Sequence, residues 1–140
     1  MDNSVWRAEF ALGIPLFDEA HQVFGEQVQQ LLDGPDQDFF TGLEELITAL
    51  EDDFRLEEAL MEAIAYPAIC SHREQHARVL ASLHSLSPDD VAAGRHAARL
   101  LLPWFELHLA TADTALAIAL QMAGDDTAGL TETKTLTMEK

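Results

Sequence analysis

The chain has 140 residues and a formal net charge of -17 at neutral pH, because 25 acidic side chains outnumber 8 basic ones. This length suits one domain that buries a single core without disulfides or metals as staples. The charge argues against nucleic acids and anionic membrane surfaces as partners, and no stretch approaches the ~20 consecutive apolar residues that span a bilayer.

The single cysteine and the N-terminal residues bear on location. Cys70 cannot form an intrachain disulfide, and the first residues, MDNSVWRAEF, lack the basic start and apolar run of a secretory signal. We therefore expect a cytoplasmic protein whose partners are small molecules, metals or other proteins.

Apolar residues at helical spacing predict the first two helices. After an irregular N-terminal arm (residues 1–17), a first helix runs to Gly34-Pro35 and carries Ala20, Phe24, Val28 and Leu31. A second begins near Gln37 and ends near Tyr66-Pro67. Its apolar positions are Phe40, Leu43, Leu46, Ile47, Leu50, Phe54, Leu60 and Met61.

Two more helices complete the predicted fold. Ile69, Val79, Leu80 and Leu83 mark the third. The segment Ser87-Pro88-Asp89-Asp90 predicts the start of the fourth, with Ser87 as the capping hydroxyl, and Pro103 predicts a kink before Trp104. The fourth helix should end near Met122. The chain is thus predicted to be an all-α, antiparallel up-down four-helix bundle over residues 1–123, with a flexible tail over residues 124–140.

Four of the six histidines fall on the apolar faces of these helices. His21 precedes Phe24 by one helical turn, His72 and His76 share one face of the third helix, and His108 lies one turn after Trp104. His84 and His96 are expected at the surface. One inward histidine is usually a satisfied core residue, but four on three helices indicate a metal site.

The segment LEDDFRLEEALM, residues 50–61, adds carboxylates to this interior. Asp53 and Glu57 are one turn apart on the apolar face, where burial is costly without a cation. The neighbours expected to be peripheral are Glu51, Asp52, Arg55 and Glu58. Asp113 follows His108 by five residues, so on an ideal helix its side chain points about 140° away from that of His108. A π-bulge, or a position between two metals, could allow Asp113 to join the same site.

In their order, these motifs resemble the hemerythrin family, particularly the single-domain bacterial members. The resemblance covers roughly residues 6 to 116. It includes Trp6, then LGIPLFDEAHQVF around His21, FRLEEALM with Glu57, YPAICSHREQH with His72 and His76, and WFELHLATAD with His108 and Asp113.

The resemblance implies two iron ions bridged by Glu57, Asp113 and an oxo or hydroxo group. His72, His76 and His108 would complete one iron. His21 and a histidine from the second helix would bind the other, which keeps an open position for dioxygen or peroxide. The residues that match the apolar ligand pocket of the family are Phe24, Phe54, Trp104 and Leu109.

The chain departs from the family pattern at one position. The family reads HFxxEE on the second helix, whereas this chain reads DFRLEE, so Asp53 stands where a ligand histidine is expected. An anionic oxygen ligand favours the ferric state and lowers the reduction potential. If the shorter aspartate does not reach, the helix must move inward, a water must bridge, or the site holds one metal.

Three functions follow from this pattern. The first is a di-iron protein that binds or senses dioxygen with altered redox behaviour. The second is an oxidase or peroxidase that reduces oxygen or hydrogen peroxide at the same cluster, and the third is a bundle with a structural metal. Four histidines favour iron, although manganese also suits a carboxylate-enriched site. A reductant or signalling partner would be a separate molecule.

Overall fold

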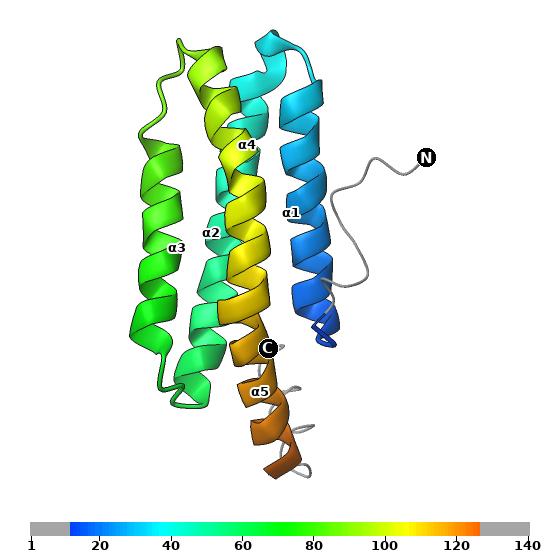
Figure 1. Cartoon of the computed structure of the whole chain (residues 1–140), viewed down its shortest axis with the longest axis vertical. Helices are drawn as coiled ribbons and strands as arrows, with labels where there is room; N and C mark the ends of the chain where they lie inside the picture. Colours follow the sequence, from blue (N-terminus) through cyan, green and yellow to red (C-terminus); the bar gives the residue numbers. More distant parts are fainter. Residues whose placement is uncertain (1–11, 127–140) are drawn as a thin grey trace.

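The computed structural model describes residues 12–126, which form an all-α four-helix bundle. Successive helices run in opposite directions, and the last three helical segments follow one another as a single rod (Figure 1). The predicted antiparallel fold is confirmed. The helical segments are α1 (Pro15–Asp33), a 3₁₀ turn (Asp36–Asp38), α2 (Phe39–Ala63), α3 (Ile69–His84), α4 (Val91–His108), a π-helical turn (Leu109–Asp113) and α5 (Thr114–Asp126).

The first helix begins inside the segment predicted to be an irregular arm. Pro15 occupies its first turn, where a missing backbone donor costs nothing. The carboxylate of Asp18 accepts hydrogen bonds from the backbone nitrogens of Leu12 and Gly13, at 2.7 and 3.2 Å. These bonds fix the chain where it enters the bundle. Residues 1–11 of the predicted arm lie outside the described residues.

The last helix continues beyond its predicted end near Met122. Residues 124–126, which were predicted to belong to a flexible tail, are helical. A glycine in a helix costs only about 1 kcal/mol relative to alanine, so Gly124 does not stop a helix that is already formed. Residues 127–140 lie outside the described part of the chain.

The cap of α4 also differs from the prediction. Asp90, not Ser87, caps the helix, and its carboxylate accepts a hydrogen bond from the Ala93 backbone nitrogen at 2.9 Å. The Ser87 hydroxyl instead accepts from the Asp89 nitrogen within the preceding turn. An aspartate cap combines the hydrogen bond with a favourable charge at the positive end of the helix. Pro103 lies inside α4, which remains helical through it.

Arg95 of α4 holds the end of α1 in place. Its guanidinium donates to the carbonyl oxygens of Leu31 and Leu32 at 3.0 Å and of Gly34 at 2.8 Å. It also pairs with Asp36 at 2.7 Å. The last four carbonyls of a helix lack intrahelical partners, so this one side chain satisfies two of them, those of Leu31 and Leu32, and joins the first and fourth helices of the bundle.

The buried apolar side chains form two separate clusters. The larger contains Phe24, Leu46, Phe54 and Leu101, and the smaller contains Phe17, Met61 and Leu116. At the end distal to α5, Gly94 lets α4 approach α2, because a Cβ at this position would overlap the Phe39 ring.

Within residues 12–126, no helix combines the length and the apolar character needed to cross a membrane.

Candidate metal centre

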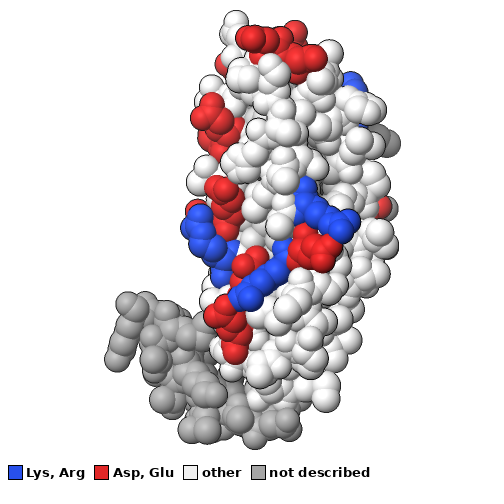
Figure 2. Space-filling model, turned by 90° about the vertical axis from the view of Figure 1, so that its left-hand side faces the viewer, with Lys and Arg blue, Asp and Glu red and all other residues white. Residues whose placement is uncertain are grey.

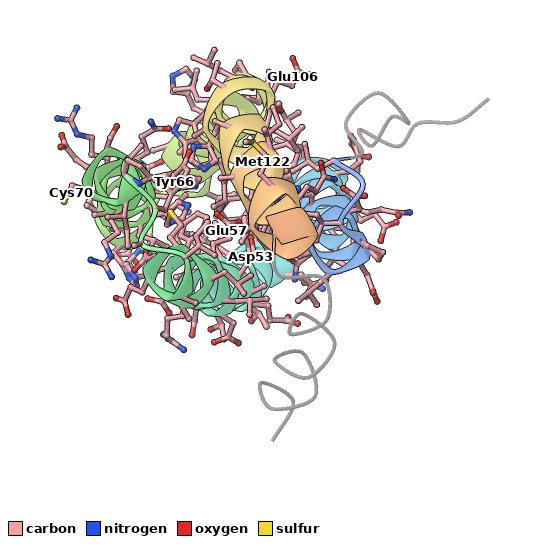
Figure 3. The ribbon with its side chains drawn as sticks, turned by 90° about the horizontal axis from the view of Figure 1, so that it is seen from below. Asp53, Glu57, Tyr66, Cys70, Glu106 and Met122 are labelled. Atoms are coloured by element: carbon pink, nitrogen blue, oxygen red, sulfur yellow. The ribbon has the colours of Figure 1, made fainter. Side chains whose placement is uncertain are left out.

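All four long helical rods contribute polar side chains to the middle of the bundle. Asp53 and Glu57 point inward from α2, whereas Cys70 lies on the outer side of α3 (Figure 3). Six of the seven predicted ligands are no more than 3% exposed, and Asp53 is partly exposed. The six are His21, Glu57, His72, His76, His108 and Asp113. His84 and His96 lie at the surface, as predicted.

The seven residues form two overlapping groups that could each hold a metal ion. In each group, one nitrogen or oxygen from every residue lies within 4.8 Å of those of the others. Glu57 belongs to both groups and therefore lies between them. The first group is Glu57, His72, His76, His108 and Asp113, and the second is His21, Asp53 and Glu57.

Asp113 reaches the cluster through the π-helical turn. The wider turn places residues five apart on one face, so Asp113 Oδ1 lies 3.2 Å from His108 Nε2 and 3.1 Å from His72 Nε2. Its other oxygen lies 3.4 Å from His21 Nε2. Of the two explanations that the sequence allowed for the spacing, the π-bulge is present, and Asp113 also contacts histidines from both groups.

Hydroxyl groups satisfy carbonyls around this turn. Thr111 donates to the Leu107 carbonyl and Thr114 donates to the Leu109 carbonyl, both at 2.7 Å. A π-helical turn disturbs the regular backbone bonding of its helix, so these threonines support the geometry that presents Asp113.

The charge of Glu57 is stabilised by its neighbours. Its Oε1 lies 3.1 Å from His72 Nε2 and 3.2 Å from His76 Nε2, and its Oε2 lies 3.8 Å from His21 Nε2. Burial opposes ionisation, but the close approach of these histidines prevails and holds the pKa of Glu57 well below its usual value. Glu57 is therefore an anion in the centre of the cluster.

Asp53 behaves differently from Glu57. Burial, followed by repulsion from Glu57, raises the pKa of Asp53 to about 8. For His72, burial lowers the pKa, but close contacts with Asp113 and Glu57 outweigh it and raise the pKa to about 9. Without a metal, Asp53 and His72 thus retain protons at neutral pH. These protons reduce the negative charge of the cluster, as a bound cation would.

The donor atoms fit a metal ion. Buried polar atoms normally have hydrogen-bond partners, yet within the described residues several buried nitrogens and oxygens of the cluster have none. In the Asp53 group, the candidate ligand atoms lie at most 4.8 Å from one another. Two ligand atoms on opposite sides of a metal ion, each bonded to it at about 2 Å, lie roughly 4 Å apart. The group therefore has nearly the size that a bound metal requires. The unpartnered atoms include His76 Nε2, His108 Nε2, Glu57 Oε2, Asp113 Oδ1 and Asp53 Oδ1.

Two residues outside the predicted set orient the histidines. His76 Nδ1 donates to the Glu58 carboxylate at 3.1 Å, and His108 Nδ1 donates to the Gln75 side-chain oxygen at 2.6 Å. Each bond turns the Nε2 atom inward, as is usual for histidine ligands. Glu58 was predicted to be peripheral, and its side chain is 29% exposed, yet it also reaches across to His76 of α3.

Glu58 also belongs to an ion-pair network on the outside of the bundle. Arg73 Nε lies 3.6 Å from the Glu58 carboxylate, and Arg73 also pairs with Glu62. On the face that carries α3, acidic and basic side chains lie close together (Figure 2). Of the two other acids predicted to be peripheral in this segment, Asp52 is 66% exposed and pairs with Arg55, and Glu51 is 34% exposed and pairs with His84.

Aromatic rings hold the histidines of the first group. Phe54 stacks on His76 with ring centroids 3.7 Å apart, and Trp104 stacks on His108 at 4.7 Å. These two rings meet edge to face at 6.5 Å. The stacking fixes the rings at a distance and orientation that hydrogen bonds alone would not determine.

The remaining members of the predicted ligand pocket lie elsewhere around the cluster. Leu109 is buried, and Phe24 packs against Phe105 with centroids 4.7 Å apart. Phe105 also meets His21 edge to face at 5.5 Å. Phe105 was not predicted, although its spacing of four from Leu101 and Leu109 places it on the apolar face of the fourth helix.

A four-helix bundle that gathers four histidines and three carboxylates in its interior is a metal-binding bundle. The chain is 30% identical over 125 residues to a bacteriohemerythrin of Ralstonia nicotianae, and the match covers 86% of this chain and 91% of the relative. No protein-family model matches the chain. The chain belongs to the hemerythrin family, as its motifs predicted, and is a hemerythrin-like metal-binding protein.

Proposed function

We propose that the cluster holds two iron ions and that the protein binds or senses dioxygen with altered redox behaviour. His72, His76 and His108 would hold one iron, and His21 and Asp53 would hold the other. Glu57 and Asp113, with an oxo or hydroxo group, would lie between them. Bound iron would supply the dioxygen-binding and redox chemistry.

The observation that carries this proposal is the position of Asp53, whose buried Oδ1 has no hydrogen-bond partner within residues 12–126. The carboxylate lies in one group with His21 and Glu57, which supports a role for Asp53 as a ligand without an inward shift of α2. A carboxylate there lowers the formal charge of a metal site by one relative to a histidine. It therefore stabilises the oxidised state and lowers the reduction potential.

The same observation favours a second candidate function. Reversible carriage requires the reduced state to persist, and a lower potential opposes the return of electrons from bound oxygen. An oxidase or peroxidase that reduces oxygen or hydrogen peroxide is consistent with this shift, and it needs an external reductant. Sites rich in carboxylates occur in di-iron proteins of the ferritin-like type.

The test begins with iron-loaded protein that is reduced without air and then mixed with oxygen. A stable oxygenated spectrum that reverses under vacuum supports binding or sensing. Direct conversion to the oxidised state, together with catalytic consumption of peroxide, supports the enzyme. Fewer than two irons per chain after full reconstitution contradicts both functions and favours a structural metal.

Asp53→His tests the role of the substituted position itself. We expect the variant to oxidise more slowly in air and to have a higher reduction potential than the unmodified protein. Glu44→His is the matched control, because Glu44 is an exposed acid of the same helix and lies outside both candidate metal groups. Equal oxidation rates and equal metal content in all three proteins would show that Asp53 does not control the site.

A further inference from the structure

Asp53 is the part of the cluster that meets the surface. The other six candidate ligands are at most 3% exposed, whereas Asp53 is partly exposed. Its Oδ1 is nevertheless buried and faces no hydrogen-bond partner among the described residues. One side of this residue therefore lies in the interior and another lies against a surface feature.

That surface feature is a groove of about 460 Å³ between α1 and α2. Apolar side chains from both helices line it, and Leu16 and Val23 are 54% and 43% exposed although they are large and apolar. The charged residues that line the groove are Glu19, Asp52 and Asp53, all of which are acidic. Such walls accommodate a small apolar or uncharged molecule and repel anions.

A second groove, of about 760 Å³, lies between α3 and α4 and includes His108 in its lining. It meets the outer edge of this histidine, because Nδ1 is bonded to Gln75 and Trp104 covers the ring face. The Nε2 atom points the other way, toward Asp113. A molecule in this groove would contact the back of the imidazole and not the donor atoms.

We propose that the groove between α1 and α2 is the route by which a small uncharged oxygen species reaches the cluster, and that it arrives beside Asp53. This inference rests on the proposed function. The Asp53 group contains one histidine, whereas the other group contains three, so a metal held there keeps more positions for an incoming molecule. Dioxygen and hydrogen peroxide share the required chemistry, since both are small and uncharged.

The experiment blocks each groove with the same substitution. Ala49 lines the first groove and Ala97 lines the second, and both are partly exposed alanines within helices. In Ala49→Trp and Ala97→Trp, the reduced, iron-loaded protein is mixed with nitric oxide, an uncharged diatomic probe, and the association rate is recorded. Mixing with dioxygen and with hydrogen peroxide in separate runs shows which of these species uses the route.

We expect Ala49→Trp to slow nitric oxide association about tenfold and Ala97→Trp to change it less than about twofold. Leu16→Trp, at an exposed position on the rim, provides a second block that does not disturb the core. Leu56→Ala widens the same groove and should raise the rate. Metal content and helical circular dichroism confirm that each variant is folded and loaded.

The possible outcomes separate this inference from the proposed function. If Ala97→Trp alone slows association, or if both variants or neither do so, the route is wrong while the proposed function stands. Should the unmodified protein bind two irons and still not react with nitric oxide, dioxygen or peroxide, the proposed function fails and the route fails with it.

Discussion

Replacing Asp53 by asparagine should make the metal-free protein more stable and the iron-loaded protein less stable. In the metal-free protein the carboxyl is partly buried beside Glu57, which contributes to raising the pKa of Asp53 from 3.8 to about 8. The folded chain therefore holds this proton more tightly than the unfolded chain does. Stability is lost as pH rises from about 4 to about 8, and an asparagine of nearly the same shape removes this loss.

The size of the effect follows from the same pKa. Each unit of difference is worth about 1.4 kcal/mol, and about three units lie between the unfolded pKa and pH 7. Asp53→Asn should therefore stabilise the metal-free protein by up to about 4 kcal/mol at pH 7, with little effect near pH 4. With iron bound the sign reverses, because the metal loses an anionic ligand and binds less tightly.

Urea denaturation of both forms between pH 5 and pH 8.5 measures these differences. Asp52→Asn is the matched control, because Asp52 is 66% exposed and its pair with Arg55 lies at the surface. Its effect should stay within about 0.5 kcal/mol at each pH. The reasoning is refuted if the gain of metal-free Asp53→Asn does not grow with pH, or if iron loading stabilises the variant as much as the unmodified protein.

Three further predictions test other parts of the structure. Because the pKa of His72 is raised to about 9, the metal-free protein should lose stability between pH 6.5 and pH 9, whereas its apparent metal affinity should increase over this range. Thermal melts and cobalt titrations at the same pH values measure the two effects, and a change in the opposite direction in either would contradict the prediction. Glu58→Gln should weaken cobalt binding about 10- to 100-fold, because it alters the bond that orients His76. Glu62→Gln changes the same arginine network without contacting a histidine and should leave cobalt affinity unchanged. An equal loss of affinity in both variants would show that the ion pairs, and not the bond to His76, cause the effect. Gly94→Ala should destabilise the fold by about 1–3 kcal/mol through overlap with Phe39, and an unchanged melting temperature would contradict close packing there.

The fold and most of the cluster could be predicted because they depend on spacing within single helices. His72 and His76 share a face whatever surrounds them, and Asp53 and Glu57 do so for the same reason. Asp113 is the informative exception. Its spacing from His108 does not suit an α-helix, and this misfit correctly indicated either a π-bulge or a position shared by two metals.

The remaining features depend on how the helices are rotated and shifted against one another. Glu58 lies next to Glu57 and is exposed by helical periodicity, but α3 approaches closely enough for His76 to bond it. Arg95 binds carbonyls more than sixty residues earlier in the chain. Periodicity within one helix contains no information on such contacts, because they arise only when two helices have a defined register.

These contacts make the two halves of the cluster unequal. On one side, Glu58 and Gln75 bond the outer nitrogens of two histidines, and aromatic rings stack on both. On the other side, Asp53 borders a groove, and its Oδ1 is buried without a hydrogen-bond partner in the described structure. A metal ion needs fixed ligands to stay bound, whereas an incoming molecule needs a free position and a path. Under the proposed function and access route, the bundle separates these requirements, with retention at the histidine-rich half and access at the Asp53 half.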